Sequence, residues 1–429
     1  MLPECRQEEH LFSVPKFDVT PSAVDSFADE LRCFHDEFRD CFYRSETREN
    51  VYHYMVGQFS KLERKSIEPI ALAVEEAKVR AMQRTISDAI WDEEKMLAKY
   101  RSMVSDDMGD SSGVLMFDES SFVKKGKDSA GVHRQYCGSI GKVENCQVGV
   151  FAAYASAHGY AVLDKRLFVP EEWFLEEYKE RRGKCAFPEE LTFKTKPQLA
   201  SEMLTEIHKQ NIIPYKYIVA DSIYGHSPDF IEAAEKFDGK IYLVSIASDT
   251  QCWLKEPVTM VKQYKYKGEV RTKTVLEDTA KNPIPVQEIA SNLNEYFWYR
   301  RKVSEGTKGP IAYDFCKKRV TLSKDGLPWK TVWLVIRRTI GDAPTYTFFI
   351  SNAPENTRLS TFVWLCGIRW AIEQCFEEGK TELGMDHYEV RKYAGWNHHM
   401  LTVILAHFFL WHLKIRLGKK SSSYYALAA

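Results

Sequence analysis

The sequence predicts a mixed α/β protein that begins with helices and carries a β-rich stretch before its last helices. Three observations support this fold class. Apolar residues recur every three or four positions up to about residue 103, which is typical of helices. Short apolar runs then alternate with helical patterns up to about residue 247, as in α/β layers. Residues 250–350 hold strand-like runs joined by turns, and the 429-residue length leaves room for two or three structural units.

The first hundred residues are expected to be helical. Phe27, Leu31 and Phe34 mark one helix within residues 24–43, and a second, long pattern extends over 69–103. Helices of this kind either form a DNA-reading bundle or serve only for packing, and their spacing does not separate the two. No clear recognition helix stands out, so a helix-turn-helix is not assigned.

Beyond the polar linker at 105–113, strands and helices are expected to alternate before the chain turns β-rich. The expected strands cover 114–117, 133–139, 147–154, 217–220 and 241–247, and the expected helices cover 196–210 and 227–237. A meander of strands is expected at 297–303, 311–322, 329–340 and 346–351, followed by helices at 359–383 and 396–413.

The composition excludes several classes of protein. Apolar residues make up 44% and charged residues 28% of the chain, which excludes wholesale disorder. No export signal is visible, and the most apolar run, 401–413, is too short for a membrane span. Ten scattered cysteines without a C-x-x-C motif predict reduced thiols in a cytoplasmic protein rather than a zinc site.

The charge is distributed unevenly along the chain. Residues 1–50 hold 12 acidic and 6 basic residues, whereas the remainder holds 53 basic and 48 acidic residues. Basic clusters recur in this remainder, among them 124–127, 179–184, 299–302 and 416–420. A patchy positive surface behind an acidic leader is compatible with a polyanionic partner, although solvated charge runs are commoner.

Two aspartates occupy equivalent local settings. Asp118 directly follows the apolar run 114–117, and Asp221 directly follows 217–220. A carboxylate at the carboxyl end of a buried strand lies where open α/β sheets build their sites. If the two strands are neighbours, the close carboxylates need a proton or a cation between them, and oxygen ligands favour Mg²⁺ or Mn²⁺. The alternative is that each aspartate begins a turn or caps a helix.

A third acid is available on the helix expected near 363–383. Arg369, Glu373 and Lys380 lie four and seven residues apart, so their side chains share one helical face. A glutamate flanked by two cations suits a metal ligand whose basic neighbours bind phosphate. A surface ladder of salt bridges would give the same spacing, and Glu377 and Glu378 are rival ligands.

Other catalytic motifs find less support. The chain has no H-E-x-x-H, no G-x-x-x-x-G-K-[ST] and no G-x-G-x-x-G that opens a helix, and 225–229 misses the nucleophile-elbow pattern. The adjacent His398 and His399 are expected to be polar packing residues rather than metal ligands.

At these residues the chain resembles the DDE transposases of bacterial insertion sequences. The resemblance is to the insertion-sequence family numbered 701, in the group marked by a Tyr-Arg-Glu-Lys signature. The segments that carry it stand in family order: LERKSIEPIA (62–71), the run from FDESSF to VGVF (117–151), LFVPEEW (167–173), FKTKPQLA (193–200), ADSIYG (220–225), EGTKGP (305–310) and the run from RWAIEQ to NHHM (369–400).

The resemblance implies a ribonuclease-H-like catalytic core that is interrupted by a β-rich insertion and preceded by a helical domain. The expected boundaries are 1–108 for the helical, DNA-binding domain, 109–249 and 346–429 for the two parts of the core, and 250–345 for the insertion. Asp118, Asp221 and Glu373 match the three acids of the family, and Arg369 and Lys380 match the signature. Cys366 stands at the signature's tyrosine position, which puts the role of that phenol in doubt.

The expected activity is cleavage of transposon ends and joining of their 3′-hydroxyl to target DNA. The three acids would hold two Mg²⁺, for which Mn²⁺ would substitute. The phosphate charge would be balanced by Arg369, Lys380, Lys124 and Lys125, and Trp298 in the β-rich insertion would shape the DNA end. The expected partners are double-stranded DNA, as terminal inverted repeats and target, and a second copy of the chain on that DNA. The expected location is the bacterial cytoplasm, at the nucleoid, with no membrane partner.

Three other functions remain open on the sequence. A transposon-derived regulator would bind terminal DNA without cutting it. A two-metal nuclease would cut DNA without joining strands. A carbohydrate hydrolase with paired carboxylates would be indifferent to DNA and to chelators.

Overall fold

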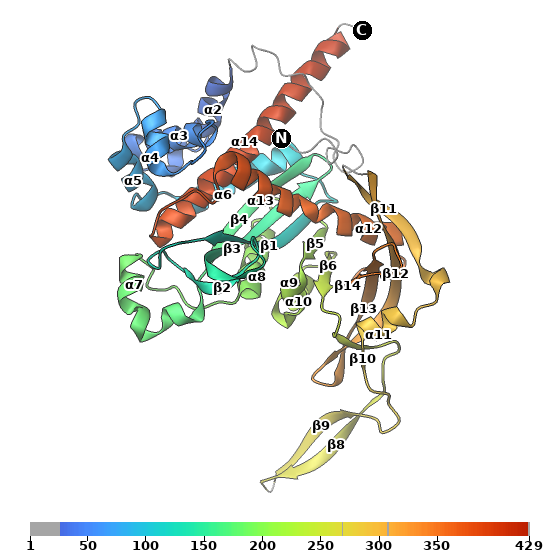
Figure 1. Cartoon of the computed structure of the whole chain (residues 1–429). Helices are drawn as coiled ribbons and strands as arrows, with labels where there is room; N and C mark the ends of the chain where they lie inside the picture. The colour runs from blue at the N-terminus through green and yellow to red at the C-terminus, as the bar shows by residue number, and fades with distance from the viewer. Residues whose placement is uncertain (1–25, 268, 307–308, 428–429) are drawn as a thin grey trace. The chain divides into compact units, whose positions relative to one another are not determined.

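The computed structural model describes residues 26–267, 269–306 and 309–427, and the chain divides into two compact units (Figure 1). Unit 1 comprises Met1–Lys216 and Arg369–Ala429, and unit 2 comprises Tyr217–Ile368. Helices accompany strands in both units, and the strand pairs are both parallel and antiparallel. The predicted α/β class is therefore confirmed, whereas the four predicted domain boundaries remain predictions.

The N-terminal part of unit 1 is helical, as predicted, but its helices are shorter than expected. The helices are α2 (Phe27–Asp36), η2 (Arg39–Cys41), α3 (Ser45–Gln58), α4 (Ile67–Ala73), α5 (Val79–Ser87) and α6 (Glu93–Met108). The single helix expected over 69–103 is wrong, because the chain turns twice within it. Glu76 adopts a positive φ of 64° between α4 and α5, and Trp91 forms an isolated bridge with Phe42 before Asp92 caps α6.

The sheet of unit 1 is built around its longest strand. Its strands are β1 (Val114–Val123), β2 (His133–Cys137), β3 (Lys142–Ser156) and β4 (Gly159–Phe168). Strand β3 pairs antiparallel with the other three. Every residue of β3 from Cys146 to Ser156 is buried, so this strand lies in the core of the unit.

Helices from both ends of the chain pack on this sheet. After η3 (Glu171–Phe174), η4 (Glu176–Tyr178) and α7 (Lys179–Lys184) come α8 (Lys196–Gln210) and, beyond unit 2, α13 (Trp370–Leu383) and α14 (Tyr393–Leu427). The predicted helix 196–210 is confirmed residue for residue, because Thr195 and Gln198 form a capping box at its start. Helix α13 contacts β1, β3 and β4, and α14 contacts β4 as well as α2, α3, α5 and α6 (Figure 1).

Helix α14 is longer than the predicted 396–413. Within the described residues, its stretch Tyr393–Leu417 is the one segment long and apolar enough to cross a membrane. Of the most apolar window, 67% is buried inside the protein. Its apolar character is therefore that of a core helix around which the N-terminal helices pack.

Unit 2 combines two parallel strands with an antiparallel meander. Its elements are β5 (Tyr217–Ala220), α9 (Ser222–Gly225), α10 (Pro228–Glu235), β6 (Ile241–Ile246), β7 (Gln251–Trp253), β8 (Thr259–Tyr266), β9 (Glu269–Leu276), β10 (Ile284–Pro285), α11 (Val286–Ser291), η5 (Glu295–Phe297), β11 (Tyr299–Gly306), β12 (Gly309–Lys324), β13 (Leu327–Arg338), β14 (Tyr346–Ser351) and α12 (Leu359–Ile368). The predicted meander is confirmed, since β11, β12, β13 and β14 pair in succession and β14 pairs with β6. Strands β8 and β9 form a separate two-stranded sheet.

Some predictions fall on residues outside the described part of the chain. They include half of the acidic leader, residues 1–25, and part of the 305–310 motif. Nine cysteines lie in the described part, and all nine are free thiols, as predicted.

Candidate active site

Asp118 lies in the middle of strand β1 rather than after its end. The predicted strand stopped at Phe117, but β1 continues to Val123 because all ten of its residues pair with β3. Asp118 stands opposite Phe151 in this register. The interpretation of Asp118 as a residue at a strand's carboxyl end is therefore wrong, and so is the alternative of a turn or cap. The acid is held inside a regular sheet.

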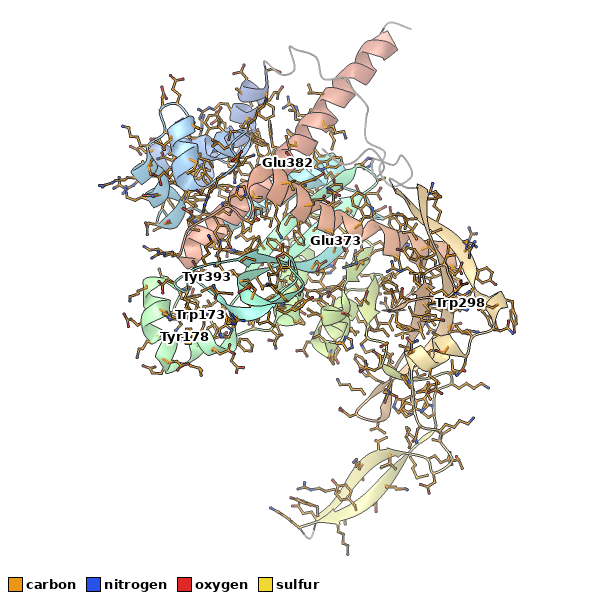
Figure 2. All side chains as sticks on the ribbon, viewed as in Figure 1. Trp173, Tyr178, Trp298, Glu373, Glu382 and Tyr393 are labelled. Atoms are coloured by element: carbon orange, nitrogen blue, oxygen red, sulfur yellow. The ribbon has the colours of Figure 1, made fainter. Side chains whose placement is uncertain are left out.

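Helix α13 reaches Asp118 because it packs on the neighbouring strand. The rings of Phe151 on β3 and Phe376 on α13 meet edge to face, with centroids 5.1 Å apart. The helix expected over 359–383 is interrupted at Arg369, which is the N-cap of α13. Residue Glu373 then falls in the first turn of α13 (Figure 2).

Arg369 joins the first and third predicted acids. Its Nη1 lies 3.2 Å from Oδ2 of Asp118, and its Nη2 lies 2.8 Å from Oε1 of Glu373. The shared face predicted from the spacing of Arg369 and Glu373 is confirmed by this second contact. The first contact links residues 251 positions apart, which no helical spacing reveals.

The chemistry of this cluster fits a divalent cation. Asp118 is largely shielded from solvent, with a side chain 15% exposed, and its Oδ1 accepts a hydrogen bond from the Glu119 amide at 2.8 Å. Two carboxylates from different elements thus face a single guanidinium, which offsets part of their charge. Hard oxygen donors held around one positive charge are the ligands that Mg²⁺ and Mn²⁺ prefer.

Glu119 is a further acid at this place that the sequence reasoning missed. One of its carboxylate oxygens lies within 4.8 Å of one of Asp118. Its Oε1 is also 3.0 Å from Nζ of Lys196 at the start of α8. The available signal was its position directly after Asp118, but adjacent strand residues normally point to opposite faces.

The three predicted lysines differ in their surroundings. Lys380 lies on α13 with its Nζ 3.4 Å from the Ser121 carbonyl oxygen, so it stays near β1. Lys124 donates to the Tyr388 carbonyl oxygen at 2.9 Å, and its ammonium sits 3.3 Å from the centroid of the Tyr388 ring. Burial lowers the pKa of Lys124 to about 7 and also lowers the pKa of Lys380. Lys125 is exposed.

The two rival acids on α13 are distinguished by their contacts. Glu378 accepts a hydrogen bond from the Tyr160 hydroxyl at 3.0 Å, and its Oε2 lies 2.7 Å from Nε2 of His407. These contacts occupy both of its oxygens within the core. Glu377 is exposed, one turn beyond Glu373.

Asp221 lies in unit 2 and keeps the position that its sequence predicts. It directly follows β5, which pairs in parallel with β6, and is the N-cap of α9. Its Oδ1 accepts a hydrogen bond from the Ile223 amide at 3.0 Å. Both interpretations made from the sequence, the strand end and the helix cap, therefore hold for this residue.

Trp298 and Cys366 also lie in unit 2. Trp298 follows η5 and begins the approach to β11 (Figure 2). Its ring is covered by the guanidinium of Arg338 at 4.3 Å, and its buried Nε1 has no hydrogen-bond partner in the described structure. Cys366, at the signature's tyrosine position, lies in the last turn of α12 and is partly exposed.

The adjacent histidines are packing residues, as predicted. Nδ1 of His398 lies 2.9 Å from the Ile86 carbonyl oxygen, and Nδ1 of His399 lies 2.8 Å from the Tyr54 hydroxyl. Burial lowers the pKa of His399 to about 3, so this side chain is neutral at physiological pH.

Comparison with known proteins identifies the family of this chain. A model of the DDE superfamily endonucleases matches residues 37–310, which include Asp118 and Asp221. The probable transposase for insertion sequence element IS701 of Microchaete diplosiphon is 23% identical over 343 residues, which cover 79% of this chain and 76% of that protein.

Two solved structures share a weaker likeness. The synaptic complex of piggyBac transposase with hairpin DNA has a TM-score of 0.40 at 10% identity, covering 93% of this chain and 74% of that chain. The NurA nuclease from Sulfolobus solfataricus has a TM-score of 0.27 at 10% identity, covering 64% and 81%. Neither TM-score is high enough to assign a fold. The family match, in contrast, spans more than half of the sequence. This chain belongs to the DDE superfamily of endonucleases.

Proposed function

We propose that this protein is the DNA transposase of an insertion sequence. It cleaves the ends of its element and joins the 3′-hydroxyl to target DNA by phosphoryl transfer in a ribonuclease-H-like core. Asp118, Asp221 and Glu373 are its three acids, and the β-rich segment between the second and third acids is an insertion into that core. The relationship to the IS701 transposase and membership of the DDE endonucleases support this function.

The contact of Arg369 with two of these acids is the observation that carries the proposal. Asp118 and Glu373 come from a strand and a helix far apart in the sequence, yet both bind one guanidinium. Salt-bridge ladders on a helix would pair Arg369 with Glu373 only. A shared cation between distant carboxylates is instead the arrangement that a metal centre requires.

Asp221 supplies the third carboxylate. It stands at the carboxyl end of a buried parallel strand, where α/β proteins place ligand-binding residues. The cap that it forms on α9 orients its carboxylate. The resemblance to the family assigns the same residue as the second acid.

Two divalent cations, Mg²⁺ or Mn²⁺, bound by these acids would activate water or a DNA 3′-hydroxyl and stabilise the leaving oxygen. Arg369, Lys380 and Lys125 balance the phosphate charge. Lys124 adds a full charge only below about pH 7 because of its lowered pKa. Trp298 packs against the DNA end.

The N-terminal helices bind duplex DNA through helix α5. Met82, Thr85 and Ile86 bury one face of α5, whereas Arg80 and Arg84 on the opposite face are exposed. These two arginines line a groove of about 860 Å³. Its other charged lining residues are Arg391 and Lys392, from the segment before α14, and the acids Glu68, Asp88 and Glu389. Lys392 pairs with Asp88.

The remaining arginines of the groove are available to a polyanion. Within the described chain, no carboxylate lies within ion-pairing distance of Arg80, Arg84 or Arg391. An exposed helix face with unpaired arginines and Gln83 between them has the residue types that contact phosphates and base edges. Transposition needs two ends, so the protein acts as a homodimer on DNA, at the nucleoid of the bacterial cytoplasm.

A nicking assay tests the function. Duplex DNA carrying the terminal inverted repeat is incubated with Mn²⁺ and either wild-type protein, Asp118→Asn or the matched control Asp106→Asn, which changes an exposed acid on α6. Wild type and Asp106→Asn should nick the end, and Asp118→Asn should bind it without nicking. Equal nicking by both variants would remove Asp118 from the reaction. A second arm with pre-cut ends measures strand joining, which a nuclease without transfer would lack.

A further inference from the structure

Strands β8 and β9 form a two-stranded ribbon with no further strand beside it. The eight pairs from Thr259–Leu276 to Tyr266–Glu269 make up the whole of this sheet among the described residues. Figure 1 shows the ribbon extending beyond the other strands of unit 2. Its base is closed where the Glu277 amide donates to the Val258 carbonyl oxygen at 3.0 Å.

The ribbon carries exposed apolar and aromatic side chains, which do not stabilise an isolated hairpin because they are not buried. Val261 is 67% exposed and Val270 is 62% exposed, and Tyr264 and Tyr266 are also exposed. Two strands without a packed face are marginally stable in water. The two valines and the two tyrosines lie on opposite faces of the ribbon, and the exposed tyrosines indicate a face that a partner covers.

The charge of the ribbon identifies the kind of partner. Residues 259–276 contain five basic residues and one acid, Glu269. This acid pairs with Arg271, and Lys262 pairs with Asp278 just outside the ribbon. The local net charge of the ribbon is therefore +4, although the whole chain carries −1.

The basic side chains gather on one face of the ribbon. Residues directly opposite each other in an antiparallel pair share a face, and every second residue along a strand does so too. One face, here called the basic face, carries Lys262, Arg271 and Lys273 together with Tyr264, Tyr266 and the single acid Glu269. The other face carries mainly uncharged residues, with Lys265 as its one cation among the described residues.

Two like charges stand directly opposite each other on the basic face. Lys262 on β8 is the register partner of Lys273 on β9. Like charges at facing positions destabilise a sheet. An alternative role for these lysines is protection of the strand edges against aggregation. That role does not require two lysines to face each other or to lie on the same face as the tyrosines. Asp278 offsets part of this repulsion through its pair with Lys262, and a polyanion bound on this face would offset the rest.

We propose that the basic face of the β8–β9 ribbon binds duplex DNA. The major groove is wide enough to admit a two-stranded ribbon. Lys262, Arg271 and Lys273 contact backbone phosphates, and the two tyrosines pack against sugars or base edges. The inference rests on the proposed function, because it assumes an enzyme whose substrate is DNA. It adds a contact in unit 2 that is separate from the acids and from helix α5.

A pair of matched substitutions in the full chain tests the ribbon. Lys273→Ala removes a charge from the basic face, and Lys265→Ala removes the same charge from the opposite face of the same ribbon. Fluorescence anisotropy gives the affinity for a terminal-repeat duplex and for an unrelated duplex of equal length over a range of salt concentrations. Lys273→Ala should lower the slope of log affinity against log salt by about 1 for both duplexes. Lys265→Ala should leave that slope unchanged.

Removal of the ribbon provides the second arm. Because Val258 and Glu277 are adjacent at its base, an Asn-Gly turn can replace residues 259–276. This variant should keep its circular dichroism spectrum and lose at least about tenfold in DNA affinity. The inference would be overturned if the variant without the ribbon bound both duplexes with wild-type affinity, or if it changed only its oligomeric state. Equal effects of the two lysine substitutions on the salt dependence would also overturn it. The proposed function is supported if the variant without the ribbon still nicks terminal-repeat DNA at saturating concentration. If the wild-type protein fails to nick this DNA, the proposed function is refuted, whereas the test of DNA binding by the ribbon is unaffected.

Discussion

The guanidinium of Arg369 lies 3.2 Å from the carboxylate of Asp118, and the two residues are 251 positions apart. Strand β1 holds the acid, and the N-cap of α13 holds the arginine. The same guanidinium binds Glu373, so it stands between the two acids assigned here to a metal centre. An arginine in this place competes with a divalent cation for the same oxygens.

Replacement of Arg369 should therefore change metal binding and turnover in opposite directions. In Arg369→Gln, the carboxylates lose their competing cation, so Mg²⁺ should bind more tightly, by roughly fivefold for a coupling of about 1 kcal/mol. Nicking should nevertheless fall, because a charge that balances phosphate is lost. Titration calorimetry with Mg²⁺ and a nicking assay at saturating metal measure the two effects. Weaker Mg²⁺ binding would mean that Arg369 orients the acids rather than competing with the metal.

Two glutamates on α13 offer a matched comparison. Glu373→Gln should reduce nicking by at least about 100-fold, because a metal ligand is lost. Glu377→Gln changes an exposed acid one turn later and should keep nearly full activity. Initial rates of Mn²⁺-dependent nicking on terminal-repeat DNA measure both. Similar losses in the two variants would move the third ligand away from Glu373.

A buried ion pair on β4, which β3 separates from the strand of Asp118, should contribute to stability rather than to catalysis. Asp164 and Arg101 have fully buried side chains and lie 2.8 Å apart, and Asp164 also binds Arg166. Asp164→Asn leaves the buried Arg101 with only its longer ion pair to Glu206, at 3.3 Å, and also removes the carboxylate that Arg166 binds, which should lower the free energy of unfolding by about 3 kcal/mol. Glu180→Gln, in the exposed pair with Lys184, should change the free energy of unfolding much less. Urea unfolding compares the two variants, and equal midpoints would contradict the difference in burial.

Lys124 should make stability depend on pH. Its pKa is lowered to about 7 by burial, against the opposing charges of Asp386 and Glu389 and with a small effect of Arg64. Above about pH 7 the folded protein has released a proton that the unfolded chain still holds, so this group makes the fold more stable as pH rises toward 10.5. Lys124→Met should flatten that rise, whereas Lys125→Met, at an exposed neighbour, should not. Free energies of unfolding at pH 6.5 and pH 9 for the three proteins provide the measurement. An unchanged slope in Lys124→Met would show that Lys124 keeps its proton in the fold.

Local sequence signals predicted elements that are set by their own caps and apolar runs. Helix α8 begins at its capping box, and strand β5 coincides with the run 217–220. Asp118 was misplaced at a strand end because the residues after it, including Ser120 and Ser121, are polar. They are nevertheless buried and paired in β1, since β3 is long enough to pair with the whole strand. Only the register with β3 determines this, and no local pattern contains it.

The candidate site was predictable in its residue types but not in its contacts. The four-residue spacing of Arg369 and Glu373 predicts one of the two ion pairs, whereas the pair with Asp118 depends on the packing of α13 against the sheet. The surroundings of Lys124 were not predictable from the local sequence either. It stands in a run of basic residues, which is typical of an exposed side chain. Its contact with Tyr388, 264 positions later, buries it in part instead.

Under the proposed function, helix α14 would fix the distance along the DNA between its binding site and its cleavage site. One continuous helix contacts α5, which carries the arginines of the groove, and also α13, which carries Glu373. If α5 binds the DNA end and Glu373 belongs to the catalytic site, as proposed, this helix would set the interval between the bound base pairs and the phosphodiester that is cut. Base pairs inserted between the bound segment and the cleavage site should then shift the position of the cut or abolish cleavage. The protein would thereby set the length of the terminal repeat that it can cleave.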